Sequence, residues 1–222
     1  MNQEIWSAVD EYFCETLIPF DQALSDALRD SDAAGLPQHN VAPNQGKLLH
    51  LLAKLQGARK ILEFGTLGGY STIWLARALP AGGRVVSLEA NPKAAAVAKA
   101  NIARAGLSHV VDIRIGKAID TLPLLAQEGV APFDFIFIDA DKPSNPKYLE
   151  WSVKLSRPGT VIVSDNVVRN GAVAEATSTD PNVVGVRRFF ELMAGHSRLS
   201  ATAIQTVGSK GFDGFSLAIV SA

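Results

Sequence analysis

The chain has 222 residues, of which 47% are hydrophobic, and its formal net charge is −1. This length and composition suit one domain with a full core, and the near-neutral charge argues against a nucleic-acid-binding surface. The single cysteine, Cys14, excludes both an intramolecular disulfide and a cysteine-based metal site. The N-terminal segment carries acids, and no apolar stretch approaches the ~20 residues of a membrane span, so we expect a cytoplasmic protein.

The first part of the chain is predicted to be helical over residues 1–57, with a loop around Leu36–Asn44. Pro19 is expected to kink or split the first helix. We therefore predict one domain over 1–222, made of an N-terminal helical cap (1–57) and a core (58–222). Several apolar residues of the first helix share one side at helical spacing. They fit three roles: packing on the sheet's helices, roofing a binding site, or pairing with a second subunit. These residues are Ile5, Trp6, Val9, Tyr12, Phe13 and Leu17.

Apolar segments then alternate with helical ones at a near-regular interval. The predicted strands are Lys60–Phe64, Arg84–Glu89, Val110–Ile115, Phe133–Asp139 and Thr160–Asp165. The predicted helices between them are Tyr70–Leu79, Pro92–Ala105, Ala118–Gln127 and Pro146–Leu155. Strands and helices that alternate in this way form βαβ units around a parallel sheet with right-handed crossovers.

The alternation of strands and helices ends after Asp165. Val167–Asp180 reads as a polar loop and Asn182–Ala194 as a helix. The loop is a candidate wall of a binding site, in which Arg169 and Asn170 either contact an acidic or polar part of a ligand or face solvent. Leu199–Val207 and Phe212–Val220 then read as two strands joined by a short glycine-flanked turn, which is typical of a hairpin. The fold class is therefore α/β, with a mostly parallel sheet that an antiparallel C-terminal hairpin closes.

The segment Ile61-Leu-Glu-Phe-Gly-Thr-Leu-Gly-Gly-Tyr-Ser71 predicts a strand, a tight glycine turn and a helix. In a parallel sheet this arrangement presents backbone N–H groups to a polar ligand. The spacing G-x-x-G-G differs from the G-x-G-x-x-G of a dinucleotide fold. Glu89 ends the second strand, where an acid can accept two hydrogen bonds from a ribose diol. Glu89 also fits a plainer role as a surface acid before a helix N-terminus.

Polar side chains gather where the fourth and fifth strands end. Asp139, Asp165 and Asn166 carry hard oxygen ligands that could share one ion of the size of Mg²⁺. They fit a helix cap and a turn equally well. Lys142, three residues after Asp139, is either a proton acceptor beside this ion or a solvated lysine paired with Asp141.

Three motifs together resemble the cation-dependent O-methyltransferases, the bacterial relatives of caffeoyl-CoA and catechol O-methyltransferases. The motifs are Glu63–Ser71, Asp139-Ala-Asp-Lys142 followed by Tyr148-Leu149, and Asp165-Asn166. The resemblance runs from about Gln45-Gly46 to Gly211-Phe-Asp-Gly214. It departs at Ser144-Asn145-Pro146, where family members often have Asn-Tyr, and Val41–Gln45 matches only loosely.

The resemblance implies a class I methyltransferase fold that binds S-adenosylmethionine (SAM). It implies that Asp139, Asp165 and Asn166 hold Mg²⁺ or another divalent cation, which stabilises the phenolate of a vicinal diphenol. Lys142 takes the proton, with Asp139 beside it, and the phenolate oxygen attacks the sulfonium methyl group in line. The cofactor-binding residues that the resemblance implies are Glu63, Gly65, Tyr70, Ser71, Glu89, Ala118 and Asp139.

The predicted acceptor is a small catechol or a hydroxycinnamoyl-type molecule, in a homodimeric enzyme without nucleic-acid or membrane partners. Two enzyme classes of similar fold are alternatives: a methyltransferase that acts on nucleic acid or protein, and an NAD-type dehydrogenase. The charge balance is poor for the first, and the G-x-x-G-G turn argues against the second. A non-catalytic ligand-binding module is the last alternative, and the intact Asp/Lys/Asp/Asn set argues against it.

Overall fold

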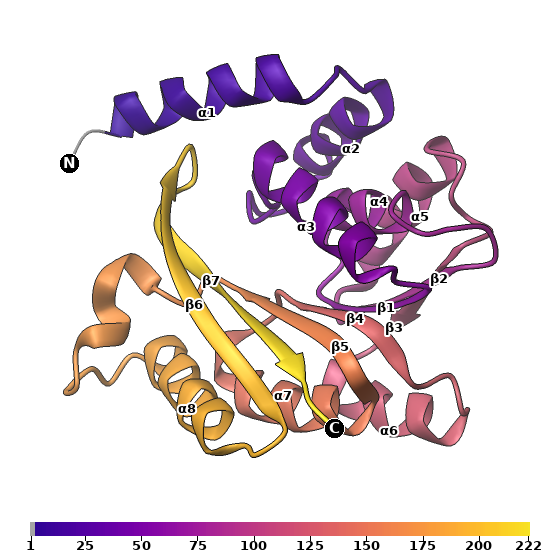
Figure 1. Cartoon of the computed structure of the whole chain (residues 1–222). Helices are drawn as coiled ribbons and strands as arrows, with labels where there is room; N and C mark the ends of the chain where they lie inside the picture. Colours follow the sequence, from indigo (N-terminus) through magenta and orange to yellow (C-terminus); the bar gives the residue numbers. More distant parts are fainter. Residues whose placement is uncertain (1–2) are drawn as a thin grey trace.

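The computed structural model describes residues 3–222 and contains one seven-stranded sheet (Figure 1). The strands are β1 (Lys60–Phe64), β2 (Arg84–Glu89), β3 (Val111–Ile115), β4 (Phe133–Ile138), β5 (Ser156–Asp165), β6 (Leu199–Gly208) and β7 (Gly211–Val220). Their order is β3-β2-β1-β4-β5-β7-β6, and only the pairs of β7 with β5 and with β6 are antiparallel. The predicted parallel sheet with an antiparallel C-terminal hairpin is confirmed.

Helices cover both faces of this sheet (Figure 1). One face carries α2 (Gln22–Ala33), α3 (Pro43–Gln56), α4 (Tyr70–Ala76) and α5 (Pro92–Arg104). The other carries α6 (Ala118–Gln127), α7 (Asn145–Lys154) and α8 (Pro181–Gly195). Every residue of β4 is buried, as expected of a central strand that is covered on both sides.

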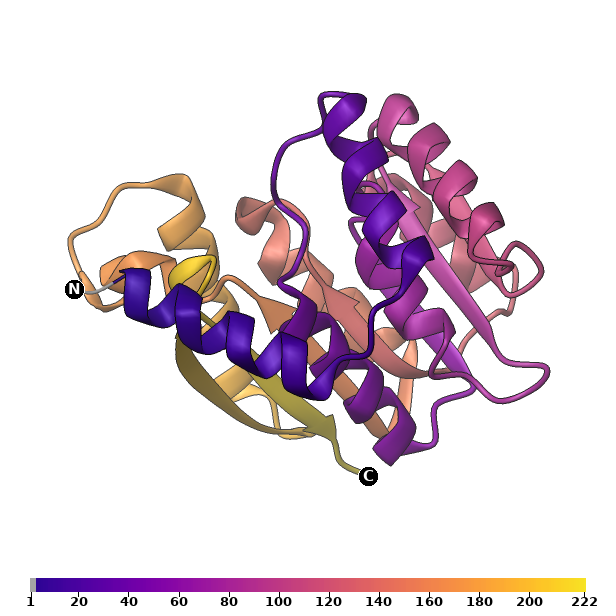
Figure 2. The ribbon, with the colours of Figure 1, turned by 90° about the horizontal axis from the view of Figure 1, so that it is seen from above.

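The first helix, α1 (Gln3–Leu17), lies above these layers in Figure 1 and, seen from above, runs across the β6–β7 hairpin toward α3 (Figure 2). Pro19 lies in the break before α2, so it separates two helices as predicted. None of the described α1 residues is buried. The helix is held at its inner side, where the Asp10 carboxylate accepts hydrogen bonds from the Asn44 side chain (2.8 Å) and the Ser209 backbone (2.7 Å). Among the described residues, no helix has the length and apolar character that a membrane crossing requires.

Four segments differ from the prediction by more than a residue. Strand β5 begins at Ser156 and not at Thr160, because Ser156 pairs with Phe133 across a register shift. Helix α4 ends at Ala76 instead of Leu79, since Pro80 disfavours helical backbone before it. The expected loop after Asp165 contains the 3₁₀ helix η2 (Arg169–Ala174), and a second short one, η1 (Lys142–Ser144), precedes α7.

Candidate active site

A cavity of about 1100 Å³ lies beyond the carboxyl ends of β1, β2, β4 and β5. Ligands collect at this edge of an open α/β sheet. All but one of the site residues predicted from the sequence line the cavity. These lining residues are Gly65, Tyr70, Ser71, Glu89, Ala118, Asp139, Lys142, Asp165 and Asn166.

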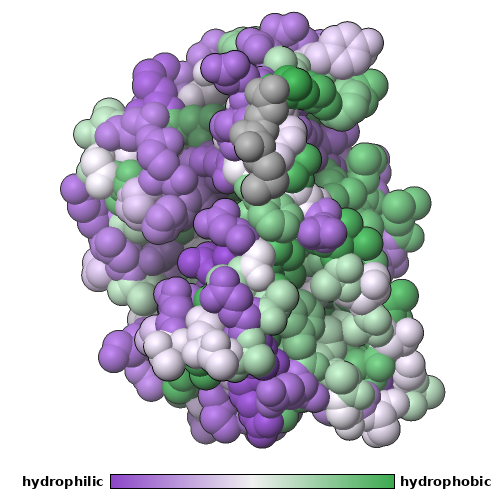
Figure 3. All heavy atoms as spheres, turned by 90° about the vertical axis from the view of Figure 1, so that its left-hand side faces the viewer, coloured by the Kyte–Doolittle hydropathy of each residue, from purple (hydrophilic) through white to green (hydrophobic). Residues whose placement is uncertain are grey.

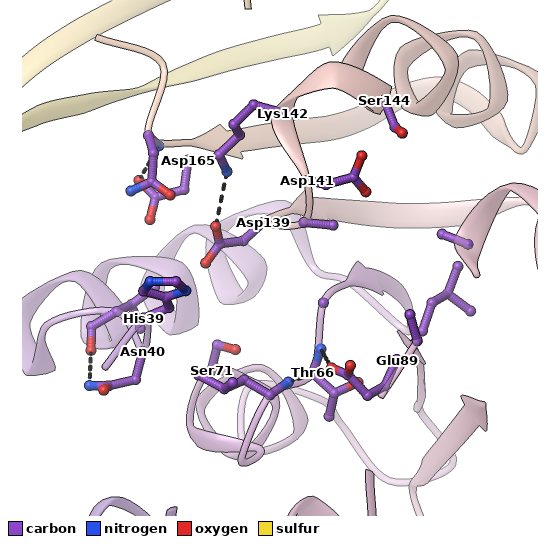
Figure 4. Close-up of a pocket in the computed structure, with 18 of the residues that line it drawn as sticks. His39, Asn40, Thr66, Ser71, Glu89, Asp139, Asp141, Lys142, Ser144 and Asp165 are labelled. Atoms are coloured by element: carbon purple, nitrogen blue, oxygen red, sulfur yellow. Dashed lines mark hydrogen bonds and ion pairs between the residues drawn. The ribbon is translucent and has the colours of Figure 1, made fainter. Parts of the chain in front are cut away.

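The glycine turn after β1 forms one wall of the cavity. Gly65 has a φ of +90°, and a Cβ atom there would lie 2.2 Å from the carbonyl oxygen of Asp139, so only glycine fits. Leu67 also adopts a positive φ, of 48°. The turn is held by Glu89, whose Oε2 accepts hydrogen bonds from the N–H groups of Thr66 (3.1 Å) and Leu67 (2.8 Å). Glu89 therefore orders the turn while it faces the cavity (Figure 4).

Glu63 is the predicted site residue that does not line the cavity. Its side chain is completely buried behind the turn, and its carboxylate accepts hydrogen bonds of 2.6 Å from the hydroxyls of Ser71, Thr72 and Ser87. Burial raises the pKa of Glu63 to about 7, although these three hydrogen bonds lower it. Glu63 thus orients Ser71, which does face the cavity, and does not itself reach a ligand there.

Two carboxylates meet at the ends of β4 and β5. Ile138 pairs with Ser164 in the sheet, so Asp139 and Asp165 leave neighbouring strands at the same level. Lys142 is 6% exposed, and its Nζ donates a hydrogen bond of 3.1 Å to Oδ1 of Asp139 (Figure 4). Lys142 therefore pairs with Asp139 and not with Asp141, whose carboxylate accepts a hydrogen bond from Tyr148 instead.

The environment of Asp165 carries an excess of negative charge. Burial and, to a lesser extent, the charge of Asp139 raise the pKa of Asp165 to about 7, while Lys142 opposes this shift. Asn166 follows with a φ of 55°, and its N–H donates to Oδ1 of Asp165 at 2.8 Å. Within residues 3–222, no three side chains of the types His, Cys, Asp or Glu converge as metal ligands. The candidate ligand set therefore consists of two carboxylates and one amide oxygen.

Further lining residues come from segments other than these strand ends, and of these segments only the loop that contains Arg169 is expected beside the site from the sequence. His39 and Asn40 reach it from the loop between α2 and α3, and Lys210 reaches it from the tip of the β6–β7 hairpin. Arg169 in η2 and Asn182 in α8 complete this side. The Gly208–Gly211 turn and the loop around residues 36–44 were recognisable in the sequence, but no local pattern shows which loops converge on one sheet edge.

Comparisons with known proteins place this arrangement in a family. Residues 20–218 match the model of the O-methyltransferase family. The chain belongs to this family. It is 54% identical to the catechol O-methyltransferase of Niastella koreensis over 99% of this chain and 100% of that protein. The two mutually supporting signals in the sequence, the glycine turn and the acidic strand ends, therefore indicated the correct family.

Solved structures agree with this assignment. An O-methyltransferase from Bacillus cereus, solved in complex with SAH, superimposes with a TM-score of 0.98 at 59% identity and covers 99% of this chain and 100% of its own. The O-methyltransferase TomG from Streptomyces achromogenes, involved in tomaymycin synthesis and solved in complex with SAM, gives a TM-score of 0.97 at 53% identity over the full length of both chains. The predicted methyltransferase fold is confirmed.

Proposed function

We propose that this chain is a SAM- and divalent-cation-dependent O-methyltransferase that acts on a vicinal diphenol. The observation that carries the proposal is the convergence of Asp139 and Asp165 beside Lys142, on the cavity that the glycine turn also lines. The relative from Niastella koreensis is named a catechol O-methyltransferase, which supports a diphenol acceptor.

The cofactor would lie along the glycine turn. Gly65 leaves room for close approach of the methionine portion, Tyr70 and Ser71 lie beside its carboxylate, and Glu89 holds the ribose. Both oxygens of Glu89 already accept backbone hydrogen bonds, one of them from Asn91 at 2.8 Å, so the carboxylate is fixed in one orientation. Ala118 begins α6 at the side where the adenine would lie. The relatives solved with SAH and with SAM support this ligand.

The cation site fits a hard divalent ion. Asp139, Asp165 and Asn166 offer the carboxylate and amide oxygens that Mg²⁺ takes in proteins, and three ligands leave positions for an acceptor. The pKa of Asp165 is raised first by burial and second by the charge of Asp139, and Lys142 offsets this only in part. A bound divalent cation would supply the missing charge and Lewis-acid stabilisation of a phenolate at neutral pH.

Lys142 is placed to move the proton. Its ammonium faces Asp139 from a nearly buried position, so solvent does not compete for it. Lys142 would accept the proton of the acceptor's hydroxyl group, and Asp139 would keep the resulting ammonium in place. The remaining residues position the two reactants, which supplies much of the rate in a methyl transfer.

Chelation tests the proposal. Methylation of caffeic acid with SAM should disappear on addition of EDTA and return with excess Mg²⁺. Heat-denatured enzyme with Mg²⁺ gives the background rate. Full activity after chelation would remove the cation from the mechanism, and methylation of none of a panel of diphenols would remove the acceptor class.

We further propose that the enzyme is a cytoplasmic homodimer that pairs through α1. This helix points its polar Gln3 and Asp10 at the body of the protein, where both form hydrogen bonds with the hairpin turn. Its apolar side is turned outward. The exposed fractions are 56% for Ile5, 44% for Val9 and 64% for Tyr12. Hydrophobic residues gather along one side of this face of the molecule (Figure 3). Covering such a patch with a second copy would remove apolar surface from water.

A further inference from the structure

The connection between β5 and α8 builds an arginine into the wall of the cavity. Arg169 lies three residues after the candidate ligand Asn166 and lines the same cavity. Its backbone has a φ of 55°, which is uncommon for a residue with a long side chain. The carboxylate of Asp213 in β7 holds this conformation by accepting hydrogen bonds from the N–H groups of Val168 (2.9 Å) and Arg169 (3.1 Å). Strained backbone that other side chains hold in place is typical of functional sites.

The guanidinium has no anionic partner in the described part of the chain. The Nε atom of Arg169 is buried and forms no hydrogen bond there. No carboxylate of residues 3–222 forms an ion pair with Arg169. The charge of Arg169 contributes to the lowered pKa of Asp180, but the main cause is the hydrogen bond that the N–H of Asn182 donates to this carboxylate. A half-buried cation without a partner is costly unless a ligand compensates it.

A second cation lies on the same cavity. Lys210, at the tip of the β6–β7 hairpin, lines it and donates a hydrogen bond of 3.1 Å to the backbone oxygen of Gln38, so its charge is also left without a carboxylate partner among the described residues. Two of the cavity's acids are engaged within the protein: Asp139 by Lys142 and Glu89 by the glycine turn.

We infer that the acceptor carries an anionic group, a carboxylate, at its end away from the diphenol, and that Arg169 is the residue that selects for it. This inference rests on the proposed function. The planar guanidinium can donate from its two terminal nitrogens to both oxygens of one carboxylate. Lys210 adds long-range attraction at the exposed edge of the cavity. The acceptor class is therefore the dihydroxyaromatic acids, as opposed to neutral or cationic catechols.

Matched acids and amides test this directly. We would measure kcat/KM with SAM and Mg²⁺ for dihydroxybenzoate, dihydroxyphenylacetate and dihydroxycinnamate, each against its primary amide, which has the same shape and no charge. A hydrogen bond to a charged group contributes about 1.5–3 kcal/mol, so we expect a preference for the acid of about 10-fold or more at the chain length that fits. Equal values for acid and amide at all three lengths overturn the inference.

The Arg169→Gln variant assigns the preference to its residue. It should raise KM for the preferred acid about 10-fold or more and leave the amide within about 3-fold, which a general loss of structure would not do. Arg169→Lys keeps the positive charge and loses the bidentate hydrogen bonds of the guanidinium, so its KM for the acid should lie between those of the natural protein and Arg169→Gln. Arg188→Gln is the matched control, because this arginine is exposed on α8 and pairs with Glu191. An equal loss for acid and amide in Arg169→Gln would contradict the role of Arg169.

The outcomes separate the two claims. If the amides are methylated in a Mg²⁺-dependent reaction and the acids are no better, only the acidic acceptor is excluded. If none of the six diphenols is methylated, the proposed function fails, and the acidic acceptor fails with it.

Discussion

Lys142 is 6% exposed, and its Nζ lies 3.1 Å from Oδ1 of Asp139. Lysine side chains are rarely this buried, because burial costs the solvation of the ammonium group, so the position indicates a functional role. We expect Lys142→Met to lower kcat by about 10²- to 10⁴-fold, the usual contribution of a positioned acid or base, with a smaller change in the KM for SAM. Steady-state kinetics checks this. Lys147→Met is the control, since Lys147 pairs with Glu150 on the exposed side of α7. A variant that retains near-normal kcat would exclude Lys142 as the proton acceptor.

Glu63 makes the stability of the fold depend on pH. Its pKa is raised from 4.5 to about 7, chiefly by burial, so the folded protein holds this proton more tightly than the unfolded chain. The stabilisation from protonated Glu63 is complete below pH 4.5 and is lost as the pH rises to about 7. The loss is at most about 3 kcal/mol in the free energy of unfolding.

Glu63→Gln, which stays neutral, should lack this loss. Urea unfolding at about pH 5 and about pH 8 measures this. The free energy of unfolding of the variant, relative to that of the natural protein, should be higher at about pH 8 than at about pH 5. Parallel changes of the two proteins with pH would show that Glu63 does not titrate in this range.

At the scale of elements, the turn between β1 and α4 depends on a backbone that passes within contact of β4. In Gly65→Ala the added methyl group would meet the carbonyl oxygen of Asp139, and the positive φ adds strain. Gly106→Ala is a close control, because Gly106 also has a positive φ, of 73°, but its added methyl group meets nothing within 4 Å. We expect Gly65→Ala to cost about 1–3 kcal/mol more than the control and to weaken SAH binding, measured by urea unfolding and calorimetry. Equal costs would exclude the close approach.

The sequence predicts the elements best where local chemistry decides them. Apolar runs such as Phe135–Ile138 and stop signals such as Gly106 indicate where strands and helices lie, and the structure agrees. Strand β5 begins earlier than predicted because Ser156 pairs with Phe133 of β4, a contact that the local sequence does not show. The candidate site follows the same division. The acids at strand ends and the loop that contains Arg169 are visible in the sequence as candidates, whereas Lys210 joins them only through tertiary packing.

At the scale of the whole molecule, α1 tests the proposed dimer. Val9→Glu combined with Tyr12→Glu should give a monomer, because charges would replace apolar side chains in the interface while the hydrogen bonds of Gln3 and Asp10 to the body remain. Light scattering after size exclusion measures this. Leu124→Glu, at an exposed position of α6, should remain dimeric. A natural protein that is monomeric at all concentrations would end the dimer proposal.

The central claim is that one divalent cation is held by side chains from the ends of neighbouring strands. A crystal structure with Mn²⁺ and SAH, read at the manganese edge, tests it most directly. We expect one anomalous peak about 2.1 Å from oxygens of Asp139, Asp165 and Asn166, the distance typical of a hard divalent ion. A fully active enzyme with Mn²⁺ at saturation and no peak between these three residues would contradict the account.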